Sequence, residues 1–245
     1  MAGKLLINGV SGVGKTSLLQ SLLNAFVISR DGKNFPFNMP HMLVPAFYNM
    51  NTLLNGGTVG VGEEEVVVEG FFDKVEKYND KFGKYPETIA IDSCSKIMQD
   101  IIDVSNLHYT NFDIHSNINK EIAILTRFIQ EDLVANGMNV VMLNHVMDND
   151  KKGLVPVGQG KFKDKGGFYS EVDHSILVTD MKIKHRGVAN QARTTINELP
   201  DIQYIENIVD PTKSKKLKEG ETYYNLQSHL ELILETHNNN SEWSF

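Results

Sequence analysis

A short glycine-rich stretch near the start of the chain has the residue types and spacing of a phosphate-binding loop. Residues 9–16 read Gly-Val-Ser-Gly-Val-Gly-Lys-Thr and match the pattern G-x-x-x-x-G-K-[ST]. In such a loop, backbone N–H groups face the phosphates, Lys15 reaches the β- and γ-phosphates, and the Thr16 hydroxyl is a ligand for Mg²⁺. The pattern therefore predicts a P-loop that binds ATP and Mg²⁺, formed by Gly9, Val10, Ser11, Gly12, Val13, Gly14, Lys15, Thr16 and Ser17.

The residues on either side of this stretch support the same prediction. Residues 4–8 are mostly apolar and predict a short buried strand, while residues 17–23 predict a helix. A strand, a glycine loop and a helix are the elements that a P-loop needs, because the helix N-terminus adds a favourable dipole for phosphate. A glycine-rich turn that binds nothing is the alternative, and this context disfavours it.

An acidic residue follows a second apolar strand. Residues 88–91 predict a buried strand, and Asp92 comes directly after them. At the carboxyl end of a strand in a P-loop fold, a carboxylate is placed to hold Mg²⁺, so Asp92 joins Thr16 as a predicted metal ligand and is a predicted catalytic residue. The alternative is that Asp92 only caps the helix predicted to begin near Ser95.

A polar pair and a long glycine-rich segment follow a third apolar strand, residues 140–143. The pair is Asn144 and His145, and residues 148–169 after it predict a long loop. Lysines and aromatic rings on a flexible loop suit single-stranded DNA, because cations pair with phosphates and rings stack on bases. A solvated linker is the alternative. The predicted DNA-binding residues are Lys151, Lys152, Lys161, Phe162, Lys163, Lys165 and Phe168.

The order of the predicted elements indicates an α/β fold. Strands alternate with helices along most of the chain, which favours a mostly parallel sheet flanked by helices, with a late antiparallel extension. Residues 1–200 are expected to form the core, and residues 201–245 a small C-terminal appendage whose polar tail is frayed. Further strands are predicted at residues 25–29, 176–179 and 194–199, and helices at residues 70–82, 95–104 and 119–136. The polar residues 182–193 are expected to separate the last two strands.

Composition limits the class of protein. The chain has 245 residues of which 41% are hydrophobic, enough to form a core without disulfides or metal. Cys94 is the only cysteine, so no intrachain disulfide is possible, and no signal pattern or membrane-length apolar run is present. These observations lead us to expect a cytoplasmic location. The formal charge of −7 argues against a broadly basic surface but leaves room for a local basic loop.

Taken together, these motifs resemble the RecA superfamily of P-loop ATPases, and most closely the phage-encoded, Sak-type, RecA-like single-strand annealing ATPases. The resemblance covers residues 3–199 and rests on the P-loop, Asp92, the Asn144–His145 pair and Lys184–Arg186. It implies a RecA-like fold and DNA-stimulated ATP hydrolysis. It also implies single-stranded DNA as a partner in annealing or strand exchange, and assembly into a homo-oligomeric ring or filament. A single-strand binding protein is a further candidate partner, and the location would be the cytoplasm of an infected host cell.

The resemblance also implies catalytic roles for four residues beyond the P-loop and Asp92. His145 would sense the γ-phosphate and pass that state to the following loop. Asp31 is the nearest match to the acid that activates water, although the family more often has Glu there and residues 63–65 compete for the role. Lys184 and Arg186 would reach ATP in a neighbouring subunit. Because Lys182, Lys184 and Arg186 alternate, a solvated edge strand is the alternative for this row of cations.

Two other functions compete with this one. A P-loop nucleotide kinase needs an arginine-rich lid, whereas the long loop here contains lysines and no arginine. A non-catalytic module, in which nucleotide only stabilises a DNA- or partner-binding fold, stays open because the match at Asp31 is weak. Hydrolysis of ATP stimulated by single-stranded DNA distinguishes the three.

Overall fold

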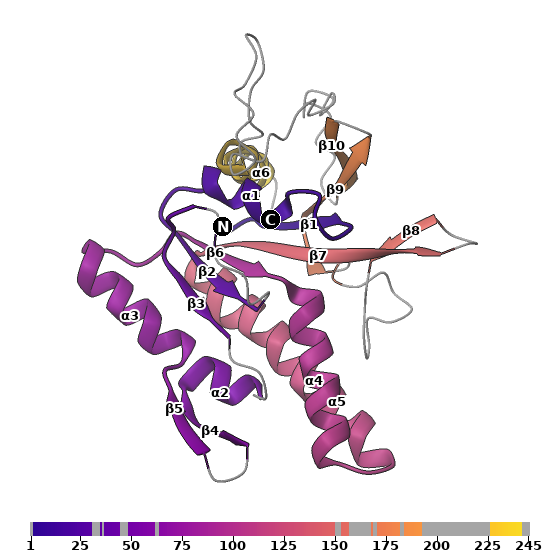
Figure 1. Cartoon of the computed structure of the whole chain (residues 1–245). Helices are drawn as coiled ribbons and strands as arrows, with labels where there is room; N and C mark the ends of the chain where they lie inside the picture. The colour runs from indigo at the N-terminus through magenta and orange to yellow at the C-terminus, as the bar shows by residue number, and fades with distance from the viewer. Residues whose placement is uncertain are drawn as a thin grey trace.

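The computed structural model in Figure 1 describes most of the chain. The described residues are 2–30, 35, 37–44, 49–61, 64–149, 153–156, 168, 171–181, 184–192 and 226–241. Several sequence predictions fall outside them: the acid Asp31 and its alternative Glu63, the DNA-binding residues predicted between 151 and 165 (five lysines and Phe162), and the strand expected at residues 194–199.

A mostly parallel sheet forms the centre of the molecule. Its spatial order is β10-β9-β1-β7-β6-β2-β3, and β8 pairs with β7 beside this path. The six strands from β9 to β3 are parallel to their neighbours, and β10 is antiparallel to β9. The strands of this sheet are β1 (Lys4–Gly9), β2 (Ala25–Ser29), β3 (His41–Leu43), β6 (Thr88–Asp92), β7 (Asn139–Asn149), β8 (Gly153–Pro156), β9 (His174–Met181) and β10 (Lys184–Ala192). The predicted α/β class with a late antiparallel extension is confirmed.

Helices cover both faces of this sheet (Figure 1). Successive strand residues point to opposite faces, so Leu6 packs with helices α2 to α5, while Leu5 and Ile7 pack with α1 and α6. Both faces of the central strands are therefore buried, which explains their continuous apolar runs. The helical elements are α1 (Lys15–Leu18), η1 (Leu19–Ser21), α2 (Met50–Asn55), α3 (Phe71–Phe82), α4 (Cys94–His108), α5 (Phe112–Arg127), η2 (Phe128–Leu133), η3 (Val134–Asn136) and α6 (Leu226–Ser241).

A separate hairpin joins α2 to α3. It consists of β4 (Gly57–Val61) and β5 (Glu64–Val68), which pair antiparallel. Figure 1 shows this hairpin at the lower end of the molecule, beyond α2 and well apart from the loop between β1 and α1. Residues 64 and 65, considered above as alternatives to Asp31, belong to β5 and thus lie far from the P-loop.

Helix α6 packs against the core. Leu226, Leu230 and Ile233 are buried in the same apolar cluster as Leu5 and Ile7. The helix is also held by polar contacts: Leu226 N donates to Ser21 Oγ at 2.9 Å, and Leu23 N donates to Gln227 Oε1 at 3.2 Å. Residues 238–241, expected to be frayed, continue the helix to Ser241.

A buried histidine pair lies where α6 meets the sheet. His229 of α6 hydrogen-bonds His174, the first residue of β9. Burial lowers the pKa of both imidazoles, and the neighbouring His174 helps to lower the pKa of His229 to about 3. Both rings are therefore neutral at pH 7, so that one donates to the other.

Three segments differ from the sequence predictions. Strand β7 runs past His145 to Asn149 and pairs antiparallel with β8, so the start of the predicted 148–169 loop is a β-hairpin. The polar segment expected to separate two strands contains β10, which pairs antiparallel with β9 at the edge of the described sheet. The predicted helix 119–136 begins earlier, at Phe112, and ends before Gly137 as expected.

The structure also corrects one predicted DNA-binding residue. Phe168 is completely buried and belongs to the apolar cluster beneath α2 to α5. A ring with no exposed surface has no face available to stack on a base. The sequence pattern was misleading here, because an aromatic residue among glycines and lysines gives the same local pattern whether its ring is buried or exposed.

We predict that Phe168→Ala destabilises the fold. Removing a buried aromatic ring leaves a cavity, which costs about 3–5 kcal/mol of unfolding free energy, and urea unfolding followed by circular dichroism measures it. Phe112→Ala is the matched control, because Phe112 is 88% exposed and its loss should change stability by less than about 0.5 kcal/mol. Equal stability of the two variants would contradict the assignment of Phe168 to the core.

Candidate nucleotide-binding site

The loop between β1 and α1 has the backbone that its sequence predicts. Gly12 and Gly14 have φ angles of +85° and +90°, a region in which residues other than glycine are strained. Gly9 is needed for a different reason: a Cβ atom there would lie 2.7 Å from the carbonyl oxygen of Val178 and 2.8 Å from the Val13 side chain. The glycines of the motif thus allow a tight turn that lies against β9.

Lys15 points into this loop. Its side chain is buried, and Nζ donates to the carbonyl oxygens of Gly9 and Val10 at 2.8 and 2.9 Å. The same atom lies 3.4 Å from Nδ1 of His145, within reach of the imidazole nitrogen. The ammonium group is therefore held where the loop would enclose phosphate groups.

Thr16 and Asp92 meet at the end of the loop. Thr16 Oγ1 donates to Asp92 Oδ2 at 2.7 Å, although 76 positions separate the two residues in sequence. Asp92 is the last residue of β6 and is 4% exposed. A hydroxyl and a carboxylate oxygen form the kind of donor set that Mg²⁺ prefers, so these residues fit the predicted metal site.

The helix after the loop is shorter than predicted. Its α-helical part covers Lys15–Leu18, and the chain continues as the 3₁₀ turn η1 before the helix ends at Leu22. A helix of one turn adds little dipole. Phosphate binding here would therefore depend on the loop N–H groups and Lys15 rather than on the helix.

The order of the strands sets the positions of these residues. Strand β7 lies between β1 and β6, with His145 in register with Gly9 and with Leu143 in register with Asp92. His145 therefore stands between the P-loop strand and the Asp92 strand, at the edge of the sheet where both end. Its backbone N–H donates to Ser95 Oγ at 3.2 Å, which ties β7 to the start of α4.

A row of buried polar side chains supports the loop from below. Asn8, Asn144 and Ser175 belong to β1, β7 and β9, and each is fully buried. Asn144 Nδ2 lies 3.5 Å from Asn8 Oδ1, and Asn8 Nδ2 lies 3.4 Å from Ser175 Oγ. The row links the three strands directly beneath Gly9 and His145. Asn8 interrupts an apolar strand, a sequence signal that could have marked this row.

Arg30 is a further residue that the sequence analysis did not identify. It follows β2, and its backbone N–H donates to the Asp92 carbonyl oxygen at 2.6 Å. Its guanidinium forms a bidentate ion pair with Asp100 of α4, and burial raises the pKa of that carboxyl group despite the arginine. This pair holds the end of β2 beside Asp92. Asp31, the next residue along the chain, lies outside the described part.

The only cysteine in the chain lies next to this site but does not suit nucleophilic chemistry. Cys94 is fully buried at the start of α4, and burial together with Asp92 raises the pKa of its thiol. A buried, protonated thiol is a poor nucleophile, so Cys94 acts as a small apolar core residue.

Two of the remaining predicted site residues lie on a peripheral strand. The backbone of Lys184 and Arg186 belongs to β10, an edge strand whose start pairs with the end of β9, so both lie at the P-loop edge of the sheet. Figure 1 shows the β7–β8 hairpin projecting from the same edge. Of the predicted DNA-binding residues, Lys151, Lys152, Lys161, Phe162, Lys163 and Lys165 lie outside the described residues.

No protein-family model matches the chain, and no curated protein matches it in sequence. Among solved structures, the RadB recombinase is similar over 78% of this chain and 81% of its own, with 11% sequence identity and a TM-score of 0.45. The fold described above rests on the strand order of the chain itself.

The described residues contain neither a membrane-spanning helix nor a cluster of metal-binding side chains. None of their helices is both long and apolar enough to cross a membrane. No group of three or more His, Cys, Asp or Glu side chains among them is arranged to hold a metal ion. The Thr16–Asp92 pair would hold Mg²⁺ together with phosphate oxygens, which supply the other ligands.

We predict that Asp92→Asn separates nucleotide binding from hydrolysis. The amide keeps the size of the side chain and its contact with Thr16 but removes the charge that would hold Mg²⁺, so ATP should still bind while hydrolysis falls by orders of magnitude. Steady-state phosphate release and binding of a fluorescent ATP analogue at several Mg²⁺ concentrations measure the two effects.

The matched control for this variant is Asp103→Asn. Asp103 is an exposed aspartate of α4, so the same chemical change there should leave both measurements unaltered. If the Asp92→Asn variant hydrolyses ATP at the wild-type rate with a normal dependence on Mg²⁺, Asp92 serves only as a structural partner of Thr16.

Proposed function

We propose that this chain is an ATP-dependent, Mg²⁺-requiring, RecA-like ATPase that binds single-stranded DNA and promotes annealing or strand exchange in phage recombination. The observation that carries the proposal is the meeting of Lys15, Thr16, Asp92 and His145 at one edge of a parallel sheet. These residues come from two strands, β6 and β7, and from the start of α1 after the glycine loop, so their convergence supports a nucleotide site rather than a chance match to a motif.

The chemistry proposed here is attack of water on the γ-phosphate, in line with the departing diphosphate. Lys15 would stabilise charge on the phosphate oxygens together with the backbone N–H groups of the loop. Thr16 and Asp92 would hold Mg²⁺, which neutralises phosphate charge when it is bound. Asp31 remains the proposed water-activating acid; it is the next residue in sequence after Arg30, whose backbone N–H donates to the Asp92 carbonyl oxygen.

His145 would connect the nucleotide to DNA. Its ring lies beside Lys15, and its strand continues without interruption into the β7–β8 hairpin. Movement of the ring in response to the γ-phosphate would therefore shift β7 and the segment after it, which includes the predicted DNA-binding lysines. A rigid strand transmits such a shift more directly than the flexible loop expected from the sequence.

Assembly into a ring or filament is also part of the proposal. Lys184 and Arg186 belong to an edge strand at the P-loop side of the sheet, where a neighbouring subunit is able to approach. Cations there would reach the ATP of that neighbour and stabilise the transferred phosphate.

We predict that single-stranded DNA stimulates ATP hydrolysis and that this stimulation requires His145. Lys15→Ala should abolish turnover, because it removes the P-loop cation, while His145→Ala should keep ATP binding and basal turnover but lose stimulation. Phosphate release with and without oligothymidylate tests both variants. Phosphate transfer to a nucleoside monophosphate would instead indicate a kinase, and ATP binding without any turnover would indicate a non-catalytic module.

We also predict that the lysines after the hairpin bind the DNA backbone. Replacing Lys161, Lys163 and Lys165 with Gln should weaken binding and lower the log–log salt slope by about 0.7 for each lost phosphate contact. Basal hydrolysis should survive, because the P-loop residues are unchanged. Fluorescence anisotropy over a range of salt concentrations measures the slope, and a wild-type slope would exclude this segment as the DNA site.

A further inference from the structure

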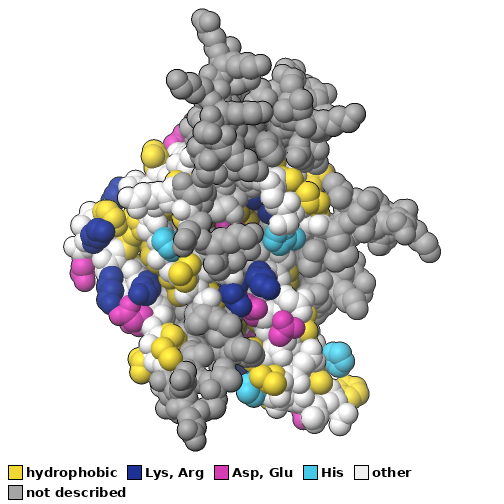
Figure 2. Space-filling view, in the orientation of Figure 1, with side chains coloured by type: hydrophobic (Ala, Val, Ile, Leu, Met, Phe, Trp, Pro, Cys, Tyr) yellow, Lys and Arg dark blue, Asp and Glu magenta, His cyan; other side chains and the backbone are white. Residues whose placement is uncertain are grey.

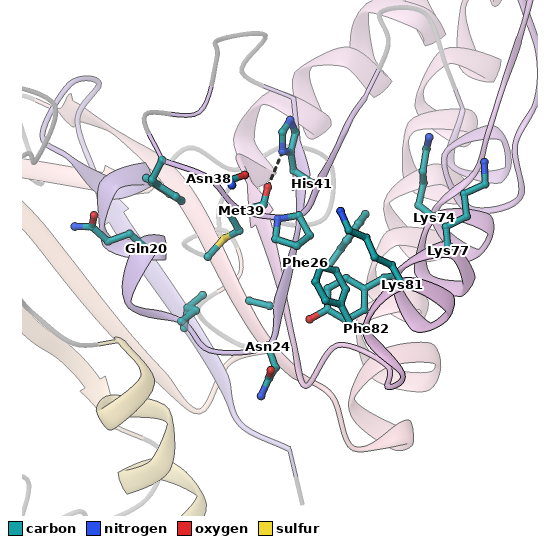
Figure 3. A pocket seen from close by; sticks show the side chains of 15 residues that line it. Gln20, Asn24, Phe26, Asn38, Met39, His41, Lys74, Lys77, Lys81 and Phe82 are labelled. Carbon is teal, nitrogen blue, oxygen red and sulfur yellow. Dashed lines mark hydrogen bonds between the residues drawn. The ribbon is translucent and has the colours of Figure 1, made fainter.

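A groove with a cationic side lies away from the nucleotide site. It has a volume of about 870 Å³ and runs between α3 on one side and η1, β2 and the segment before β3 on the other. Figure 3 shows its two walls: Lys74, Lys77, Lys81 and Phe82 come from α3, and Asn38, Met39 and His41 come from the opposite side. None of its lining residues belongs to the P-loop or to Asp92.

The lysines of α3 form a row along the groove. Lys74, Lys77 and Lys81 are spaced three and four residues apart, which puts them on one face of the helix. At 1.5 Å of rise per residue, the row extends about 10 Å, which is longer than a single phosphate group. Figure 2 shows several Lys and Arg side chains, with acidic side chains beside them, on the side of the molecule that α3 occupies in Figure 1. The helix acids Asp73, Glu76 and Asp80 are each one position earlier and thus on a different face.

One carboxylate limits the positive charge of this row. Glu69 accepts hydrogen bonds from both Lys74 and Lys77, and these bonds lower the pKa of its carboxyl group to about 2, so it is ionised at neutral pH. Lys81 forms no ion pair with a described carboxylate; its Nζ instead lies 5.3 Å from the centre of the Phe82 ring. Three cations against one anion leave this wall positive, although the chain as a whole carries −7.

Aromatic and amide groups complete the groove. Phe82 is 47% exposed at the end of α3, where its ring has a free surface. Across the groove, His41 Nδ1 contacts the Met39 carbonyl oxygen at 2.8 Å, which fixes the orientation of the imidazole. Asn24 and Asn38 add amide groups to the lining. A row of cations beside an exposed ring and amides is the combination that binds single strands, since cations pair with phosphates and rings stack on bases.

We propose that the α3 groove is a second binding site for single-stranded nucleic acid, with Lys77 and Lys81 on the phosphate backbone and Phe82 against a base. A row of lysines in line suits successive phosphates of one strand better than the compact phosphate chain of a free nucleotide. Glu69 acts as an internal competitor that keeps Lys74 and Lys77 partly neutralised. The proposal shares its ligand with the proposed function but does not need the ATP site.

The test uses full-length protein without ATP, labelled oligothymidylate and two variants with opposite expected effects. Lys77→Gln/Lys81→Gln should weaken binding about tenfold and lower the log–log salt slope by about 1.4, which corresponds to two lost phosphate contacts. Glu69→Gln should instead strengthen binding and steepen the slope, because it removes the carboxylate that pairs with Lys74 and Lys77. A purely structural role for this cluster does not predict tighter binding.

A matched control removes two cations elsewhere. Lys120→Gln/Arg127→Gln makes the same change in net charge on α5, where both side chains are exposed, and should leave the affinity and the slope close to wild type. If both double variants lose the same affinity for the oligonucleotide, binding depends only on the overall charge, and the proposed groove site is overturned. Photochemical cross-linking of the oligothymidylate should label Phe82 or His41, and absence of label from both would also overturn it.

Two further measurements separate this proposal from its alternatives. Thymidine monophosphate should compete poorly with the labelled oligothymidylate for the groove. If it displaces the oligonucleotide fully at an equal concentration of phosphate groups, the groove binds single nucleotides, and the proposal of a site for single strands is overturned. The groove variants should lose affinity equally in a Lys15→Ala background. The proposed function and the groove can fail separately. If the wild-type protein hydrolyses no ATP but the groove variants still lose affinity for the oligonucleotide, the proposed function fails and the groove site is retained.

Discussion

The contact between Thr16 and Asp92 is the constraint on which the site depends. It joins the loop after β1 to the end of β6, two strands that are not neighbours in the sheet. Strand β7 lies between them, so the contact forms only if β1 and β6 end at the same level along β7. The register of β1 and β6 against β7 provides that level, and the buried Asn8–Asn144–Ser175 row holds β1, β7 and β9 together beneath it.

The two faces of the sheet have different roles in supporting this arrangement. On one face, α2 to α5 form a large apolar layer in which the rings of Phe26, Phe71 and Phe128 meet edge to face. On the other, the short α1 and η1 leave the sheet thinly covered, and α6 from the end of the chain fills that space. Helix α6 therefore packs against β1, the strand that leads into the glycine-rich loop near the start of the chain.

Local charge matters more than net charge in this molecule. The groove beside α3 is positive because lysines share one face of the helix while the acids occupy another, although their numbers in the sequence are similar. The −7 charge of the whole chain acts over longer distances and is screened within about 10 Å at ordinary salt concentrations. A polyanion close to the surface therefore experiences the local lysines first.

The sequence by itself determined the α/β class, most of the strands and the P-loop, because apolar runs and glycine spacing are local signals. It also pointed to Asp92 and His145, since both follow apolar strands that must end at the same edge. Only the tertiary structure decided which residues meet them: Asn8, Ser95, Arg30 and Asp100 depend on strand order and register, which no local pattern encodes. The same holds for Phe168, whose burial depends on where its segment packs, and for α6 and the α3 groove, which join residues far apart in the chain.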